Sequence, residues 1–243
     1  MNNQNKDNLQ IGYHELSPNY GYCIDKLDLN TLNDVSEVVN YIQSDFDKAH
    51  SYNNHLAGEI KHEYLTAIMS SNLKNYIMQL VDKLDQYTNY SKKFYIHEMD
   101  KYANEIPWTL SHMWVNYMSK YEYNPLHVHN GLYSWVLWYK IPYMIENEVK
   151  YSSKNSETSG DDIVANGNFA FIHTTNPLKV TALPVDNKFE GYIAVFPSTL
   201  AHVVYPFYTS DEYRITLSGN VENYEYNRIL SPPMDNVEHN VER

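Results

Sequence analysis

The run of short strand-like segments between Pro107 and Val221 constrains the fold more than any other feature of the sequence. This region is rich in Trp, Tyr, Val, Ile and Phe, and Pro, Asn and Gly separate its segments. Repeated short strands at such spacing indicate an all-β sandwich or barrel such as a jelly roll. We predict strands at residues 109–119, 134–141, 168–174, 180–183, 192–196, 202–205 and 214–220, and a long surface loop at 144–166.

Two amphipathic segments precede this β region. Apolar residues recur at helical spacing from Val35 to Phe46, behind the candidate N-caps Thr31 and Asn33, and again from Leu73 to Leu84. Because the opposite face of each segment is polar, each helix should cover another element with its apolar side. With a short strand expected around 21–27, this order predicts an α+β, mainly β fold in which amino-terminal helices support a β core.

The length favours a single domain. A chain of 243 residues, of which 43% are hydrophobic, is long enough to bury a sizeable core. We expect one domain over residues 1–243, with mostly helical support at 1–106, the β core at 107–222 and a weakly ordered tail at 223–243.

Charge and cysteine content exclude several classes of protein. The net charge of −12 would repel the phosphate backbone of nucleic acid and an anionic membrane surface. No apolar stretch approaches the roughly 18 residues of a membrane helix, and no glycine-rich phosphate-binding motif is present. The single cysteine, Cys23, cannot form an internal disulfide, and the polar amino terminus is unlike a signal peptide. We therefore expect a soluble, cytoplasmic protein with neither a nucleic-acid nor a membrane partner, while the oligomeric state cannot be read from these features.

Three of the eleven histidines form a candidate metal site. His127 and His129 stand in NPLHVHNG, and His202 stands in PSTLAHVVYP. Residues two apart in an extended segment point the same way, so the imidazoles of His127 and His129 can converge on one point. A metal needs at least one further ligand, and a closed sandwich could place the strand of His202 beside them.

Arg214, in SDEYRITLSGN, marks a candidate anion site. It alternates with Thr216 on one face of the predicted strand. A guanidinium and a hydroxyl side by side clamp a carboxylate well, because the guanidinium fork binds two oxygens and the hydroxyl adds a third donor. The competing interpretation is an exposed ion pair between Arg214 and a nearby acid such as Glu212.

Two segments of the sequence resemble a known family. WVNYMSKYEYNPLHVHNGLYSWVLWYKIPY and FPSTLAHVVYPFYTSDEYRITLSGNV are similar to the Fe(II)/2-oxoglutarate-dependent oxygenases, most of all to the small prolyl-4-hydroxylase-like proteins of tailed, cyanophage-type phages. HLAGEIKHEYL also resembles that phage group. The resemblance implies a double-stranded β-helix (jelly-roll, cupin-like) core, Fe(II), 2-oxoglutarate as cosubstrate and O2, and the host cytoplasm as location if the chain is phage-encoded.

The resemblance also implies roles for individual residues. His127 and His202 take the two histidine positions of the family's metal triad, His129 takes the carboxylate position, and Arg214 takes the position that anchors 2-oxoglutarate. The departure is His129, because the usual triad has Asp or Glu there. Three neutral imidazoles leave more positive charge on the iron than two imidazoles and a carboxylate.

Further residues are expected in the same pocket. Tyr139 matches a strand tyrosine that helps to hold 2-oxoglutarate in prolyl-hydroxylase-like members, and Asn116 lies on the preceding predicted strand. With Thr216 they complete the expected cosubstrate-binding set, and Trp135 and Trp138 are further candidates for the pocket lining.

The expected activity is that of a dioxygenase, a hydroxylase acting on a peptide or a small molecule. One alternative is a three-histidine metalloenzyme of the cupin type that does not use 2-oxoglutarate, which the missing carboxylate favours. Another is a catalytically silent binding protein of the same fold. Arg214 favours the dioxygenase.

Overall fold

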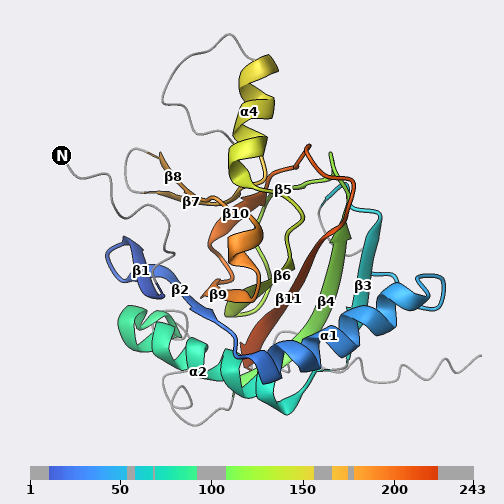
Figure 1. The fold of residues 1–243 in the computed structure, drawn as a ribbon. Coiled ribbons are helices and arrows are strands. Elements are labelled where there is room, and N and C mark those ends of the chain that lie inside the picture. Colours follow the sequence, from blue (N-terminus) through green and yellow to red (C-terminus); the bar gives the residue numbers. More distant parts are fainter. Residues whose placement is uncertain are drawn as a thin grey trace, which may run out of the picture.

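The computed structural model describes residues 11–53, 58–67, 69–91, 108–155, 166–174 and 178–223. Their strands form two antiparallel sheets that pack face to face (Figure 1). The large sheet has seven strands in the order β1-β2-β9-β6-β11-β4-β3, and the small sheet has four in the order β5-β10-β7-β8. The fold is therefore mainly β with a few helices.

The bounds of the elements follow the chain. The strands of the large sheet are β1 (Gly12–Ser17), β2 (Tyr20–Lys26), β3 (His62–Thr66), β4 (Trp108–Met118), β6 (Tyr133–Lys140), β9 (Tyr192–Pro197) and β11 (Arg214–Asn223). Those of the small sheet are β5 (Asn124–His127), β7 (Phe169–Thr174), β8 (Leu178–Leu183) and β10 (Ala201–Val204). The helices are α1 (Leu29–Ser44), α2 (Ser71–Thr88) and α4 (Ile145–Asn155), with a 3-10 turn η2 (Asn187–Phe189) before β9.

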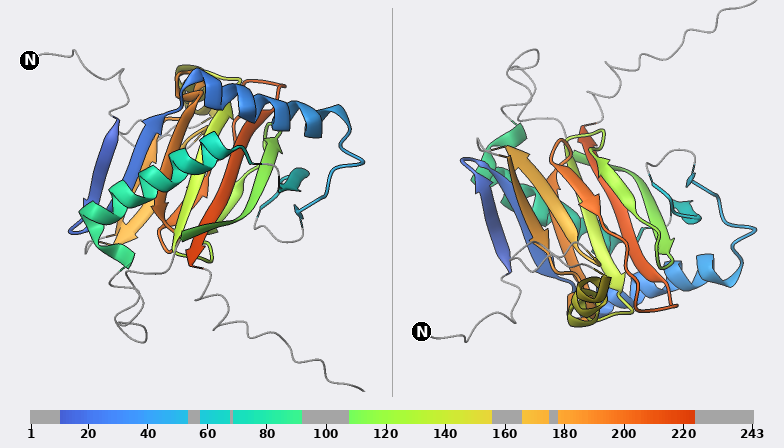
Figure 2. Two further views of the ribbon diagram at one scale, coloured as in Figure 1. Left: turned by 90° about the horizontal axis from the view of Figure 1, so that it is seen from below. Right: turned by 90° about the horizontal axis from the view of Figure 1, so that it is seen from above.

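Helices α1 and α2 lie across one face of the large sheet (Figure 2). The carboxylate of Asp28 accepts a hydrogen bond from the backbone N–H of Thr31, and the hydroxyl of Ser70 accepts one from the N–H of Leu73. These side chains cap the helices by satisfying backbone donors that have no partner within the helix. The predicted caps Thr31 and Asn33 were wrong, because Asp28 caps α1 and the helix begins at once after it.

Successive residues of the large sheet belong to two different hydrophobic cores, because side chains alternate across a strand. One set packs under the helices and includes Val115, Tyr117, Leu137, Ile215 and Leu217. The other set faces the small sheet and joins Val136, Trp138 and Phe196 to Phe169 and Phe171. The space between the two sheets is where the candidate site lies.

Most predicted strands are confirmed to within three residues at either end, and β2 matches the strand expected around 21–27. Strands β1, β3 and β5 had not been predicted. The predicted surface loop was wrong at 145–155, which form α4, where Glu146 and Glu148 provide the negative charge that favours the first turn of a helix. The rest of that segment, 156–165, and most of the predicted tail, 224–243, lie outside the described residues.

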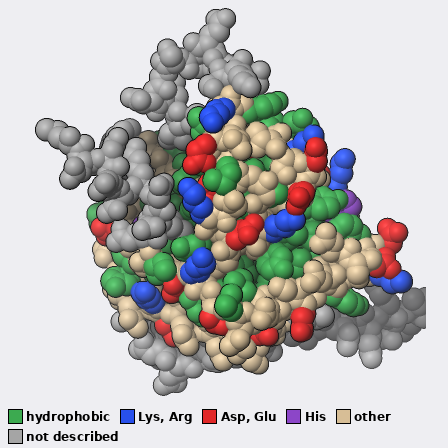
Figure 3. Space-filling model, in the orientation of Figure 1, with side chains coloured by type: hydrophobic (Ala, Val, Ile, Leu, Met, Phe, Trp, Pro, Cys, Tyr) green, Lys and Arg blue, Asp and Glu red, His purple; other side chains and the backbone are tan. Residues whose placement is uncertain are grey.

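The surface reflects the acidic composition. On the face drawn in Figure 3, the described Lys and Arg side chains are scattered among acidic ones and form no continuous basic patch. Every helix of the described residues is too short or too polar to span a bilayer.

Candidate active site

Three histidines, two from the neighbouring strands β5 and β10 and one from the loop after β5, converge between the sheets. His127 ends β5 and stands directly opposite His202 of β10 in the antiparallel register. His129 follows two residues after His127, where its backbone N–H donates to the carbonyl of Ser198 at 2.9 Å. One ring nitrogen from each histidine lies within 4.8 Å of those of the other two. The structure thus brings together all three predicted metal ligands.

Backbone carbonyls fix the orientation of two of these rings. Nδ1 of His127 is 2.6 Å from the carbonyl oxygen of Pro125, and Nδ1 of His202 is 2.9 Å from that of Leu200. A carbonyl oxygen only accepts, so Nδ1 carries the hydrogen in both rings and Nε2 keeps a free lone pair. Metal-binding histidines typically have their second nitrogen held in this way.

Burial keeps the three imidazoles neutral. It lowers the pKa of His127, lowers the pKa of His129 to about 3 with a further contribution from His127, and lowers the pKa of His202 well below its usual range. A neutral imidazole is the form that binds a metal. Nε2 of His129 lies 3.2 Å from Nε2 of His202. Because Nε2 of His202 can only accept, His129 donates its Nε2–H in the metal-free protein, and that hydrogen moves to Nδ1 when Nε2 binds a metal. This donor set fits a divalent ion of the first transition row, Fe(II) included.

No Asp or Glu of the described residues lines this cavity. One buried carboxyl of the large sheet is Glu63 of β3, which pairs in register with Asn116 of β4 and is 1% exposed. Burial and the neighbouring Glu122 raise the pKa of Glu63 to about 8. Glu63 is therefore protonated at neutral pH, and the described part of the chain offers the metal only imidazoles.

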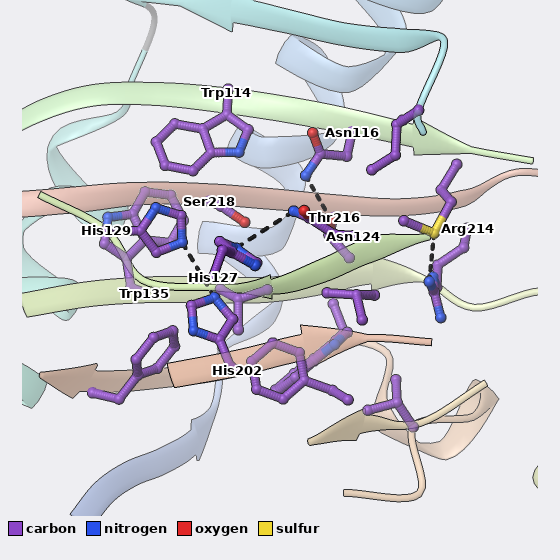
Figure 4. Close-up of a pocket in the computed structure, with 18 residues that line it drawn as sticks. Trp114, Asn116, Asn124, His127, His129, Trp135, His202, Arg214, Thr216 and Ser218 are labelled. Carbon is purple, nitrogen blue, oxygen red and sulfur yellow. Dashed lines mark hydrogen bonds between the residues drawn. The ribbon is translucent and has the colours of Figure 1, made fainter. Parts of the chain in front are cut away.

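Arg214 lies at the opposite end of the same cavity from the histidines (Figure 4). Arg214 is 2% exposed. Its guanidinium donates hydrogen bonds to the hydroxyl of Tyr143 at 2.8 Å and to the carbonyl of Tyr205 at 3.0 Å. It also donates to the carbonyl of Gly167 at 3.4 Å and contacts the sulfur of Met118. All of these partners are neutral, and no described carboxylate forms an ion pair with Arg214.

The ion pair with Glu212, the competing interpretation of Arg214, is not formed. Glu212 instead binds Lys140 at 2.5 Å on the surface. Arg214 is therefore a buried cation without a direct ion pair among the described residues, and the buried carboxylates of Glu148 and Asp186 act on its neighbour Tyr143 rather than bonding to the guanidinium. A buried cation without a direct partner favours an incoming anion.

Thr216 and Asn116 line the cavity between its two ends. They are direct neighbours in the β4–β11 register, and the side-chain amide of Asn116 donates to the hydroxyl of Thr216 at 3.4 Å. The structure thus gathers Arg214, Thr216 and Asn116 around one space. Arg214 and Thr216 were expected together from the alternation along β11, and Asn116 from its place on the preceding predicted strand.

Tyr139 does not reach this cavity. Its hydroxyl donates to the hydroxyl of Ser36 in α1 at 2.9 Å, and its ring packs into the core under the helices. The prediction for Tyr139 therefore does not fit the geometry. Trp138 and Tyr139 are neighbours on β6 and must face opposite sides of the sheet, and it is Trp138 that lines the cavity.

Several residues in or behind the cavity wall had not been predicted. Tyr143 contacts Arg214 from beyond the end of β6, and only its aromatic character near a predicted strand could have marked it. Trp114 packs against His129 with ring centroids 5.6 Å apart. Asn124, three residues before His127, has its side chain in the cavity wall, and a polar residue so close to a metal motif was the available signal.

Comparison with known proteins gives one family match. Residues 112–220 match the model of a family described as "Putative 2OG-Fe(II) oxygenase". Fe(II), 2-oxoglutarate and O2 are the cofactors that this family implies, and the three histidines fit the iron. No curated protein sequence matches the chain.

Solved structures give distant matches. A prolyl-4-hydroxylase from Pseudomonas putida aligns at 11% identity with a TM-score of 0.48, covering 84% of this chain and 93% of that one. A 2OG-Fe(II) oxygenase family oxidoreductase from Burkholderia pseudomallei aligns at 13% identity with a TM-score of 0.40, covering 83% and 84%. A viral collagen prolyl hydroxylase from Paramecium Bursaria Chlorella virus-1, solved with 2OG, aligns at 11% identity with a TM-score of 0.39, covering 82% and 94%.

Proposed function

We propose that the protein is an Fe(II)- and 2-oxoglutarate-dependent dioxygenase that hydroxylates a small molecule or a peptide. One observation carries the proposal: a cluster of three neutral imidazoles and a buried Arg214 without a carboxylate partner stand at opposite ends of one cavity. 2-Oxoglutarate has matching ends, because its 2-oxo acid group chelates a metal and its distal carboxylate suits a guanidinium.

Each residue has a role in this proposal. His127, His129 and His202 hold the iron through their Nε2 atoms. Iron, 2-oxoglutarate and O2 together supply an oxidant able to hydroxylate a C–H bond, with succinate and carbon dioxide as by-products. Arg214 supplies the counter-charge for the distal carboxylate, and Thr216 and Asn116 bind the cosubstrate along its length.

The fold, the location and the origin of the protein are also part of what we propose. We interpret the packed sheets as the double-stranded β-helix expected from the sequence, with α1 and α2 as its support, in a single domain. A cytoplasmic location is proposed on the strength of Cys23, which is buried and free. A phage origin rests on the sequence resemblance alone, and so does a prolyl substrate.

A second candidate function is supported by His129. An imidazole in the position of the triad carboxylate gives the all-histidine donor set of cupin-type enzymes that do not need 2-oxoglutarate. A silent binding protein would keep the same metal site and show no turnover. The buried charge of Arg214, which has no direct ion pair among the described residues, favours the dioxygenase, because neither alternative supplies an anion that would bind it.

Anaerobic binding separates these functions. The protein is loaded with Mn(II) and its melting temperature is measured with and without millimolar 2-oxoglutarate, with the His202→Ala variant as control. The dioxygenase predicts a rise in melting temperature that depends on both Mn(II) and His202. Aerobic incubation with Fe(II) and 2-oxoglutarate should then yield succinate. A melting temperature that does not respond to 2-oxoglutarate would favour the cupin-type enzyme, and binding without succinate would favour the silent protein.

A further inference from the structure

Asn124 is a polar residue of the cavity wall that none of the roles above uses. It begins β5, it pairs with Val204 of β10 in the register, and it is 9% exposed. Figure 4 shows its side chain between His127 and Thr216, on the path from the metal end of the cavity to Arg214. Its Nδ2 lies 3.5 Å from Nε2 of His127, and its buried Oδ1 has no hydrogen-bond partner.

The hydrogen bond of His127 to Pro125 decides which way this amide points. Since Nδ1 of His127 carries the hydrogen, Nε2 of the same ring can only accept. The group of Asn124 that faces Nε2 must therefore be its donor, the Nδ2 amide. Its oxygen then faces away from the ring, beside the backbone of Gly58, and no described group donates to it.

A metal held by the histidines needs the same lone pair of His127. Once the metal occupies Nε2, Asn124 loses the acceptor that its Nδ2 now faces. Both polar ends of its side chain would then be buried without a partner, which costs free energy. A hydrogen-bond acceptor on a molecule bound to the metal can satisfy the released amide, because Asn124 lies next to a ligand ring.

We propose that Asn124 is a positioning residue that couples metal binding to cosubstrate binding. In the metal-free protein its amide contacts Nε2 of His127; in the loaded protein the same amide donates to an oxygen of 2-oxoglutarate or water bound to the metal. The identity of that oxygen as one of 2-oxoglutarate rests on the proposed function. The switch of the amide itself requires only that His127 bind a metal.

The test measures a coupling rather than an activity. The affinity for Co(II) is determined by visible spectroscopy with and without excess 2-oxoglutarate, and the ratio of the two dissociation constants is the coupling factor. Asn124→Ala should reduce this factor about tenfold, the size of one hydrogen bond to a charged oxygen. Its affinity for Co(II) alone should be equal to or higher than that of the unmodified protein, because the amide no longer competes for Nε2.

Asn116→Ala is the matched control. It removes an amide of equal size from the same wall, and its oxygen is also buried without a partner, but its Nδ2 binds Thr216 instead of a histidine. Asn116→Ala should weaken 2-oxoglutarate binding equally with and without metal and leave the coupling factor unchanged.

Asn124→Asp is an isosteric variant that keeps the shape of the side chain and loses its hydrogen-bond donor. It should bind Co(II) more tightly than the unmodified protein and show a coupling factor at least as low as that of Asn124→Ala.

Azide provides a probe that does not depend on the proposed function. If 2-oxoglutarate does not change the Co(II) affinity of the unmodified protein, the dioxygenase assignment fails, and azide binding to the Co(II) form still tests Asn124. A tenfold weaker azide affinity in Asn124→Ala supports the released amide. Two results would overturn the proposal. Loss of Co(II) binding in Asn124→Ala would show that Asn124 is itself a metal ligand. Equal coupling factors in Asn124→Ala and the unmodified protein would show that Asn124 does not couple metal binding to cosubstrate binding.

Discussion

Replacing Arg214 with methionine removes a buried charge while keeping a side chain of similar length. In the structure this change leaves the carbonyl of Tyr205 without its donor, whereas the carbonyl of Gly167 still accepts from Tyr143. One unsatisfied buried carbonyl costs about 1–3 kcal/mol. Removing a cation that has no direct ion-pair partner among the described residues offsets this by a similar amount, so the metal-free Arg214→Met protein should be within about 2 kcal/mol of the unmodified one.

The effect on 2-oxoglutarate should be much larger. A hydrogen bond to a charged group contributes about 1.5–3 kcal/mol, and each 1.4 kcal/mol is a factor of ten, so Arg214→Met should weaken 2-oxoglutarate roughly ten- to a hundredfold. Arg214→Lys should recover part of this loss, because it restores the charge without the two-pronged geometry. The affinity of the site for Mn(II) should stay nearly unchanged in both variants.

Two measurements check these magnitudes. Calorimetric titration of the Mn(II)-loaded protein with 2-oxoglutarate under anaerobic conditions gives the affinity, and thermal unfolding of the metal-free protein gives the stability. For a chain of this size, 2 kcal/mol corresponds to a shift in melting temperature of roughly 4–8 °C. Unchanged 2-oxoglutarate affinity would refute the anchor role and rank the cupin-type enzyme first. A collapse of the metal-free fold would refute the reasoning that the charge of Arg214 has no structural partner.

Further predictions concern the metal ligands and the buried carboxyl. His127→Ala and His202→Ala should each abolish stoichiometric Mn(II) binding in equilibrium dialysis without unfolding the protein; full occupancy in either variant would remove that residue from the ligand set. His129→Asp restores a carboxylate to the donor set, so it should retain Mn(II) and raise the turnover of 2-oxoglutarate to succinate, and complete loss of metal would show a site built for three imidazoles. Glu63 has a pKa of about 8 in the folded protein, against 4.5 in the unfolded chain. Between these two pH values the folded state keeps a proton that the unfolded state releases. The free energy of unfolding should therefore fall as the pH rises from 4.5 to 8, on the order of 3–5 kcal/mol in all. Glu63→Gln should remove this slope and be the more stable protein at pH 8 in denaturant titrations; the same slope in both proteins would contradict the assignment.

The strands were predictable where apolar and aromatic residues form long runs. β6, YSWVLWYK, and β9, YIAVFP, are buried over nearly their whole length, so hydrophobic content alone located them. β3, HEYLT, and the four residues of β5 are short and mixed in polarity, and only their pairing with β4 and β10 makes them strands. Pairing between distant segments is a tertiary property that no local pattern carries.

The site residues were predictable where side chains two residues apart in a strand point to the same face. Alternation led to the pairing of His127 with His129, although the strand ends at His127 and the N–H of His129 bonds to Ser198, and it holds for Arg214 and Thr216 within β11. The same rule argues against placing both Trp138 and Tyr139 in one pocket, and the family resemblance favoured the tyrosine over the rule. The amide of Asn124 could not be assigned, because its orientation depends on a hydrogen bond between His127 and the carbonyl of Pro125.

The two faces of β11 should respond differently to amino-acid substitution. Ile215 and Leu217 support the helical layer, while Arg214, Thr216 and Ser218 face the cavity. Saturation mutagenesis of this strand should therefore alternate with position: substitutions at 215 and 217 lower the yield of folded protein, whereas those at 214, 216 and 218 leave the yield and remove ligand binding. During evolution, alternate positions of β11 would therefore be constrained by different requirements. Folding limits which residues are accepted at 215 and 217, and ligand binding limits those accepted at 214, 216 and 218.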